Sequence, residues 1–469
     1  MVAAEGQRDR ERIEKLEREN ERLRAEKERL RAENERLQKL LEEALRRLHR
    51  QAGPFARNKP KQNPKTPGRK PGDGGGRRGA PQPPEKADEE HPAKLNSRCA
   101  DCGGRVEYEH TAEQWQQDII RKILWRLFHV EVGHCRRCGR RQQGRHPLQT
   151  SDALGAAAVQ IGPQALVLAA HMNKEMGQSH ERIARLLALG YGITVSRSAL
   201  CRAMERLGHR VEPTRQALVA YVRRSPVAWM DETGWRVAAV LRWLWVMATR
   251  KVSVYAVQPG RGFAQAAALI GPDYCGRLHH DGAKAYNGFV QADHQACLAH
   301  PIRRCREMIE AAANLRTVRF PVQVRELLQY AIAVRERYDR EEIGLPAMRA
   351  IATRLQNGRL DRLLSLPQRS AANLRLSNHI AELAPYLFTF LRHPEVESTN
   401  NRAERELRPA IVNRKCWGGN RTENGARTFA RLASVLRTAY LQDKDPVALL
   451  VPLLCAPKPF VLDLIPDSS

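Results

Sequence analysis

The sequence predicts an α/β protein whose main domain is a mixed sheet flanked by helices. From about residue 224 the helical periodicity stops. Short runs rich in aromatic and aliphatic residues follow at Pro226–Asp231, Leu241–Met247 and Val252–Val257, as is typical of successive strands. A helical pattern over residues 262–270 then leads to a fourth strand at Cys275–His280. Residues 300–390 are almost wholly helical in pattern, and residues 398–445 are again helical around a glycine-rich break, which gives the sheet its flanking helices.

Length and charge limit the kind of protein this can be. The 469 residues leave room for about three domains, and 79 Lys and Arg against 52 Asp and Glu give a net charge of +27. This excess favours a polyanionic partner, nucleic acid first and an anionic membrane second. Solubility alone is the simpler explanation, but it requires far less charge.

The cellular setting follows from what the sequence lacks. The first 36 residues are mostly charged, without the apolar core of a secretory signal, and no apolar run approaches the roughly 20 residues that span a bilayer. We therefore expect a cytoplasmic protein that is not inserted in a membrane. In a reducing cytosol, paired cysteines are more often metal ligands than disulfide partners.

Residues 10–49 have the pattern of a parallel coiled coil. Leucines recur every seven residues, and Asn20 and Asn34 occupy the other core position of the heptad, where Asn fixes register and favours two strands. The leucines are Leu16, Leu23, Leu30 and Leu37. The pattern predicts a homo-oligomer joined at this segment. The alternative is a single charged helix in solvent.

Two further segments precede the helical part of the chain. Residues 50–95 are a basic linker rich in Pro and Gly, which is either an arm that neutralises phosphates or a passive spacer. Residues 96–148 carry two Cys-x-x-Cys pairs, which suit a closed tetrahedral zinc site. Its ligands would be Cys99, Cys102, Cys135 and Cys138. Strands within residues 119–132 could span the long gap between the pairs. The alternative is four unrelated thiols.

Residues 151–215 are predicted to be helical. Helical patterns over Glu181–Leu189 and Ser196–Leu207 flank a glycine-containing turn, and Ser196 is placed to cap the second helix. This order resembles a helix-turn-helix that contacts DNA. Ordinary helix packing explains the pattern equally well.

Three acids have the spacing of a metal-dependent phosphoryl-transfer site. Asp231 interrupts an apolar strand, Asp281 ends the fourth strand, and Glu404 lies on a later helix. An acid within a strand is costly unless it is paired or binds a metal. Carboxylates in this arrangement hold two magnesium or manganese ions for attack on a phosphodiester. Taken singly, each acid could instead be a turn, loop or ion-pair residue.

The helix carrying Glu404 gives that acid polar neighbours. We expect Ser398 or Thr399 to cap it, and helical spacing puts Asn400 and Arg408 on the face of Glu404. Other acids close to the three in sequence are rivals for their roles. These rivals are Glu232, Asp273, Glu397 and Glu406.

Several motifs resemble those of the insertion-sequence sixty-six family of bacterial DDE transposases. The motifs are Trp229-Met-Asp-Glu-Thr-Gly-Trp235, His280-Asp-Gly-Ala-Lys-Ala-Tyr-Asn-Gly-Phe289, Cys297-Leu-Ala-His300-Pro-Ile-Arg-Arg304 and Asn400-Asn-Arg-Ala-Glu-Arg405. The order of coil, basic linker, four-cysteine module and core is similar too. The resemblance implies a ribonuclease-H-like core over residues 222–445, with a helical insertion at 300–395 and a C-terminal tail at 446–469.

The same resemblance implies an activity and its residues. The chain would cleave insertion-sequence ends and join the 3′-hydroxyl to target DNA, using Asp231, Asp281 and Glu404 as the catalytic, magnesium-binding triad. Companion proteins of the same element could assist it. The residues expected to contact DNA are Arg402, Arg405, Arg408, Arg414 and Lys415.

Two other functions fit parts of the sequence. A transposase-derived DNA-binding regulator would need no catalytic acids, and a nuclease would cut without joining. Cys297 and His300 have metal-ligand chemistry, but two ligands do not close a zinc site, so packing or support of the active site is the favoured role. His279 and His280 are expected to shape the site at the end of their strand.

Overall fold

The structure is a computed structural model. It describes residues 123–151, 160–312 and 315–467, the segment 102–113, and scattered positions between 19 and 98. Everything said below of the fold concerns these residues.

The element order agrees with the predicted change from helices to strands and back. The strands are β1 (Val132–His134), β2 (Arg141–Gln143), β3 (Val227–Val237), β4 (Val240–Ala248), β5 (Ser253–Gln258), β6 (Arg277–His280) and β7 (Asp293–Ala296). The helices around the sheet are α2 (Pro163–Lys174), α3 (His180–Tyr191), α4 (Arg197–Arg210), α5 (Glu212–Arg224), α6 (Phe263–Ile270), the 3-10 helix η1 (Lys284–Gly288), α13 (Asn401–Trp417), α14 (Glu423–Leu441) and α15 (Pro446–Cys455).

Between β7 and α13 lies a run of helices, which we call the insertion after the prediction for residues 300–395. Its elements are α7 (Ala299–Glu310), α8 (Leu315–Asp339), α9 (Leu345–Arg354), the π-helix η2 (Leu355–Leu360), α10 (Asp361–Leu364), α11 (Ala371–Leu383), the 3-10 helix η3 (Ala384–Tyr386) and α12 (Thr389–Arg392). The chain is thus of the mixed α/β class, as the sequence predicts.

Five strands form the central sheet in the order β5-β4-β3-β6-β7. β3, β4 and β5 are joined as antiparallel neighbours, whereas β6 pairs in parallel with both β3 and β7. The tight turn between β3 and β4 contains Ala238 and Ala239, both with positive φ, which explains why these two strands follow each other so closely.

Both faces of the sheet are buried. Along β3, Trp229 and Trp235 face α13 and α14, while Ala228 and Met230 face a second core that also contains α6. The alternation of faces with each residue is the ordinary geometry of a strand. Burial on both faces explains the continuous apolar runs in the sequence.

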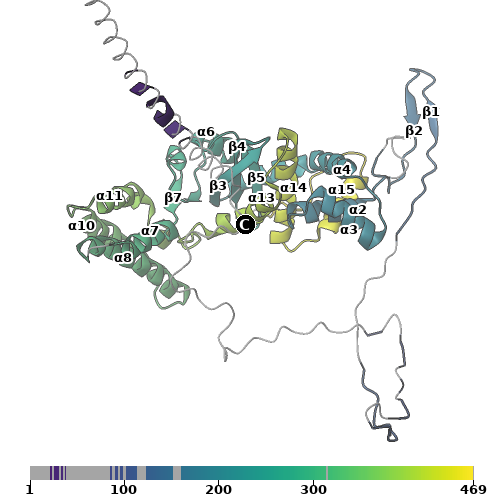
Figure 1. Cartoon of the computed structure of the whole chain (residues 1–469), viewed down its shortest axis with the longest axis horizontal. Helices are drawn as coiled ribbons and strands as arrows, with labels where there is room; N and C mark the ends of the chain where they lie inside the picture. The colour runs from purple at the N-terminus through teal and green to yellow at the C-terminus, as the bar shows by residue number, and fades with distance from the viewer. Residues whose placement is uncertain are drawn as a thin grey trace, which may run out of the picture.

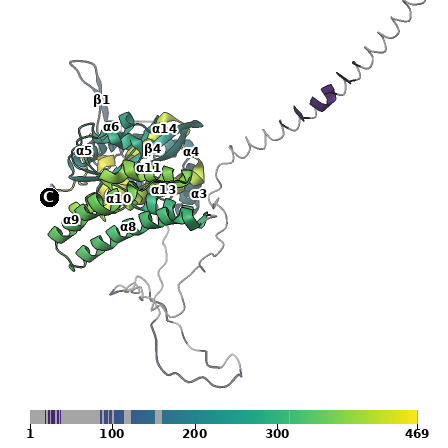
Figure 2. The ribbon, with the colours of Figure 1, turned by 90° about the vertical axis from the view of Figure 1, so that its left-hand side faces the viewer.

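The insertion has its own hydrophobic core, built from residues of α7, α8, α9, α11 and α12. Figure 1 shows these helices on one side of the sheet and helices α2, α3, α4 and α15 on the other. In the view turned by 90°, α10 and α11 lie in front of the sheet elements, and α8 and α9 lie below them (Figure 2). The insertion therefore meets the rest of the chain near the ends of β7 and α13.

The helical segment before the sheet has the predicted turn. α3 ends at Gly192, which has a left-handed φ of 67°, and the Ser196 side chain caps α4 by accepting a hydrogen bond from the Ala199 amide at 3.2 Å. Arg197, Arg202 and Arg206 are exposed on α4. The opposite face of α4 is buried in the core with α14. A role for this segment in binding DNA stays a prediction.

The N-terminal modules are described only in part. The described positions between Glu19 and Leu37 are helical, and Leu23, Leu30 and Leu37 are 56–57% exposed. The predicted heptad also includes Leu16 and Asn20, which lie outside the described residues, as does the predicted linker 50–95 apart from isolated positions between 85 and 94. Among the described residues, no helix is long and apolar enough to cross a membrane.

The four-cysteine region differs from expectation in one respect. Strands were predicted within residues 119–132, but residues 123–131 contain no strand, and β1 begins only at Val132. Most of the large apolar side chains there are exposed, including Trp125 at 71% and Leu127 at 81%, so little buried surface favours pairing at these positions. Residues 119–122 lie outside the described part.

Candidate active site

Asp231 lies in the middle of β3, on the face covered by α13. Asp231 lies an even number of residues from Trp229 and Trp235, whose side chains pack against that helix, so its side chain is on the same face of the sheet. Glu232, the next residue, points to the opposite face. The Asp231 carboxylate accepts a hydrogen bond from the Glu232 amide at 2.8 Å. The strand therefore presents an acid to the helix that carries Glu404.

Asp281 follows β6 directly, beside Asp231. β6 runs parallel to β3 with His279 opposite Trp229, so Asp281 and Asp231 each lie two residues beyond that pair. The Asp281 carboxylate accepts a hydrogen bond from the Ala283 amide at 2.8 Å, and Gly282 takes a φ of 91° in the turn. A left-handed φ here explains the glycine.

The electrostatics of Asp231 report a cluster of negative charge. Burial, and after it the nearby carboxylates of Asp281, Glu232 and Glu404, together raise its pKa to about 8. Carboxylates that disfavour one another's ionisation are the expected state of a cation site without its cation. The donor set of oxygen ligands fits magnesium or manganese.

Glu404 lies in the first turn of α13, and its side chain is 37% exposed. The helix begins later than predicted, because Asn400 and not Ser398 or Thr399 is at the N-cap position, and no side chain caps it. Asn400 is instead buried, and its amide donates to the Met230 carbonyl at 2.9 Å. This bond ties the start of α13 to β3 one residue before Asp231.

Arg261 and Tyr286 complete the acid cluster, and the sequence analysis missed both. Arg261 pairs with the buried Glu232, and its Nη2 lies 3.5 Å from a carboxylate oxygen of Asp281. Tyr286 donates its hydroxyl to the other Glu232 oxygen at 2.8 Å. Glu232 is thereby neutralised on the far face of the sheet. Arg261 occupies the loop after β5, where no spacing rule links it to the acids.

The rival acids have other surroundings. Asp273 is exposed in the turn after α6. Glu397 accepts a hydrogen bond from Arg402 at 2.7 Å. Glu406 is 3% exposed and forms a two-pronged ion pair with Arg437, at 2.7 and 3.2 Å. Of the acids on α13, Glu404 is thus the one that faces Asp231 without a strong cationic partner.

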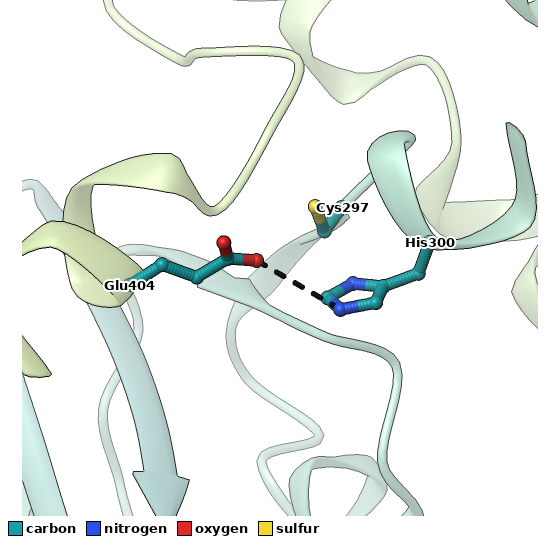
Figure 3. A group of neighbouring side chains, drawn as sticks. All are labelled: Cys297, His300 and Glu404. Atoms are coloured by element: carbon teal, nitrogen blue, oxygen red, sulfur yellow. Dashed lines mark ion pairs between the residues drawn. The ribbon is translucent and has the colours of Figure 1, made fainter. Parts of the chain in front are cut away.

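Cys297 and His300 lie beside Glu404 (Figure 3). Cys297 follows β7, His300 is in the first turn of α7, and the His300 Nε2 is 3.8 Å from a Glu404 oxygen. In the described residues, this trio is the one group of three potential ligands whose donor atoms all lie within 4.8 Å of one another. Asp231, Asp281 and Glu404 are more widely spaced, as two cations roughly 3.5–4 Å apart would require.

Comparison with known proteins gives this arrangement a family. The model of the Transposase IS66 family matches residues 158–428, which is more than half of the chain and includes all three acids. The chain belongs to this family. The resemblance found in the motifs is therefore confirmed.

Two curated relatives of this IS66-family chain come from Sinorhizobium fredii. One, "Uncharacterized protein y4jD", is 25% identical over 394 residues, covering 76% of this chain and 74% of the relative. The other, "Uncharacterized protein y4qI", is 23% identical over 290 residues, covering 55% of this chain and 52% of the relative. The chain thus spans about half the length of the second relative.

The basic residues expected to contact DNA fall into two groups in this IS66-family member. Arg405, Arg408 and Lys415 are exposed on α13. Arg402 instead lies over the Trp229 ring and pairs with Glu397, and Arg414 bonds to the Thr233 hydroxyl and the Gly234 carbonyl. Contact with DNA stays a prediction for all five.

The cysteines of the predicted zinc site are partly described. Cys135 and Cys138 lie in the turn between β1 and β2, and backbone hydrogen bonds from Cys138 and Arg137 lower the pKa of the Cys135 thiol. Cys102 is exposed, and Cys99 lies outside the described residues. A turn that stabilises a thiolate suits a zinc ligand.

Proposed function

We propose that the chain is a DDE-type transposase that cleaves insertion-sequence ends and joins the freed 3′-hydroxyl to target DNA. The observation that carries this proposal is the convergence of three acids from separate elements: Asp231 from β3, Asp281 after β6 and Glu404 on α13. The raised pKa of Asp231 supports it, because the carboxylates need a cation to ionise together. Membership of a transposase family agrees with it.

The core that we propose, residues 222–445, is ribonuclease-H-like. Three antiparallel strands followed by two parallel ones, with the first strand central, support this assignment. In that fold the acids come from the first strand, the end of the fourth strand and a later helix. The helical insertion assigned to 300–395 then separates the second acid from the third.

Each residue has a distinct task in the proposed reaction. Asp231, Asp281 and Glu404 would hold the cations. Arg261 would neutralise Glu232 and one carboxylate oxygen of Asp281. Bound magnesium or manganese supplies activation of the attacking oxygen and stabilisation of the leaving oxygen. Asn400 would hold the start of α13 against β3, so that Glu404 keeps its distance from Asp231.

The remaining segments would serve DNA and assembly. We assign residues 10–49 to a coil that pairs two protomers, 96–148 to a zinc module, and 151–215 to DNA-binding helices, with 446–469 as a tail. The exposed arginines of α4, together with Arg405 and Arg408, offer cations for phosphates. The net charge of +27 supports DNA as the partner.

Cleavage and joining assays test this function. Asp231→Asn, Asp281→Asn and Glu404→Gln should each reduce magnesium-dependent cleavage by more than 10³-fold, while binding of end DNA stays close to that of the wild type. Asp273→Asn, which changes an exposed acid, is the matched control. Normal cleavage by any triad variant would remove that residue from the triad. Cutting without joining of pre-cleaved ends would instead indicate a nuclease.

A further inference from the structure

Cys297, His300 and Glu404 bring three kinds of metal ligand to one point. A thiol from the end of β7, an imidazole from α7 and a carboxylate from α13 have donor atoms within 4.8 Å of one another. Figure 3 shows the Glu404 carboxylate and the His300 ring turned toward each other, with Cys297 beside them. Two of the three residues have no part in the proposed two-cation reaction.

The Cys297 thiol accepts hydrogen bonds from the backbone amides of Asn400, Ala299 and His300, whereas one nitrogen of the His300 ring has no partner. Cys297 is 1% exposed, and the His300 Nδ1 is buried without a hydrogen-bond partner. The Nε2 of His300 is 3.8 Å from Glu404, which is too long for a hydrogen bond. A buried imidazole nitrogen without a partner is costly, and a metal ion would satisfy it.

The chemistry of the trio selects a different ion from the catalytic one. Thiolate and imidazole favour zinc and similar transition ions, whereas magnesium prefers oxygen ligands alone. Three protein ligands leave a fourth position open, and tetrahedral zinc would hold their donor atoms roughly 3.5 Å apart. The observed spacing, at most 4.8 Å between any two donor atoms and 3.8 Å between His300 Nε2 and Glu404, is close to that geometry.

We propose that Cys297, His300 and Glu404 form a site for one zinc-class divalent ion, and that its occupation withdraws Glu404 from the magnesium site and inhibits the enzyme. The Cys297 thiol releases its proton to solvent as the sulfur–metal bond forms. The inhibition rests on the proposed catalytic role of Glu404, whereas the binding of the ion does not.

Cobalt binding to the full-length chain tests the site without any assay of activity. Co²⁺ bound by a thiolate gives a near-ultraviolet charge-transfer band, and each added thiolate increases it. The wild type should have a component of this band that is absent from Cys297→Ser and present in Cys416→Ser, which removes an exposed thiol of α13. Any band from the predicted four-cysteine module is common to all three proteins. Identical titrations of the wild type and Cys297→Ser would overturn the proposal.

A second variant covers the case in which Cys297→Ser does not fold. His300→Gln keeps the thiol and removes the imidazole, and it should weaken cobalt binding at this site at least tenfold. Unchanged cobalt affinity in His300→Gln would overturn the assignment of His300 as a ligand. A circular dichroism spectrum like that of the wild type shows that the variant is folded.

The inhibition is measured as the zinc concentration that halves cleavage in saturating magnesium, relative to each protein's own activity. His300→Gln should require at least tenfold more zinc than Cys416→Ser. Zinc that binds through Cys297 without lowering cleavage would overturn the sharing of Glu404. A Cys297-dependent cobalt band in a chain that never cleaves DNA would contradict the proposed function and support the metal site.

Discussion

Arg437 and Glu406 form an ion pair inside the protein, with Arg437 Nε 2.7 Å and Nη2 3.2 Å from the two carboxylate oxygens. The pair joins α14 to α13, and Glu175 at the end of α2 lies 3.8 Å from the same guanidinium. Tyr255 of β5 donates its hydroxyl to the Glu406 carbonyl at 2.6 Å. Glu406 therefore fixes the rotation of α13, which leaves Glu404, two residues earlier, on another side of the helix, close enough to Asp231 to raise its pKa.

Replacing each of the two glutamates of α13 in turn by glutamine should affect stability in one case and catalysis in the other. Glu406→Gln leaves Arg437 buried without its full partner and should cost about 3 kcal/mol of unfolding free energy. Glu404→Gln should cost less than about 1 kcal/mol, because its side chain is partly exposed and has no close partner. Thermal unfolding measures the first effect and magnesium-dependent cleavage the second. If Glu406→Gln were stable but inactive, the helix rotation described here would be wrong.

Asp231 should make the metal-free protein less stable as the pH rises. The folded chain keeps a proton on Asp231 up to about pH 8, whereas the unfolded chain releases it near 3.8, so this contribution to stability is lost between those values. Asp231→Asn should therefore melt at a higher temperature than the wild type in a chelator. The gain should be about 1 kcal/mol or more at pH 8 and smaller at pH 5.

Magnesium should counteract this loss of stability at high pH in the wild type, but not in Asp231→Asn. At pH 8 the cation should raise the melting temperature of the wild type and change that of Asp231→Asn much less, because the substitution removes a ligand charge. Differential scanning fluorimetry with and without magnesium, at pH 5 and at pH 8, measures the melting temperature of the wild type and of Asp231→Asn under each condition. A wild type whose stability relative to Asp231→Asn did not depend on pH would contradict the raised pKa.

The predicted zinc module should hold one tightly bound ion in the full-length chain. Cys135→Ser and Cys138→Ser each remove one of four thiolates, and each should abolish the zinc that survives dialysis against a weak chelator. Cys201→Ser, which changes an exposed thiol of α4, should retain it. Elemental analysis of protein purified under reducing conditions makes the measurement. Wild-type protein without zinc would refute the module.

The predicted coiled coil should link two protomers through residues 10–49. Asn20→Leu with Asn34→Leu should raise the melting temperature of a 1–55 peptide and loosen its preference for two strands, because buried Asn favours the dimer at the expense of stability. Sedimentation equilibrium gives the number of strands. Removing residues 1–50 should impair the joining of paired ends more than the binding of one end. A monomeric peptide at tens of micromolar would argue for a solvated helix.

Most of the helices and strands were predicted from the local pattern of apolar and polar residues. Strands β4 and β5 and helices α3 and α4 were predicted within a few residues, because burial on one or both faces leaves a periodic trace in the sequence, whereas β3 continues past the predicted end at Asp231 to Val237. The cap of α13 was predicted wrongly. Asn400 is at the N-cap position, and its side chain donates a hydrogen bond to the Met230 carbonyl of β3. This contact joins segments far apart in the chain, so no pattern in the neighbouring sequence predicts it.

The sequence by itself determined the α/β class, the order of the first four strands of the sheet and, through motif and spacing, the three acids proposed for catalysis, but it did not predict the edge strand β7. Only the tertiary structure decided which groups surround them. Arg261 reaches Glu232 and Asp281 because the loop after β5 lies over the end of β6, and Cys297 and His300 meet Glu404 across the two ends of the insertion. Contacts of this kind depend on how strands pair and helices pack. Those forces act between residues far apart in the chain and leave no periodic pattern in the sequence.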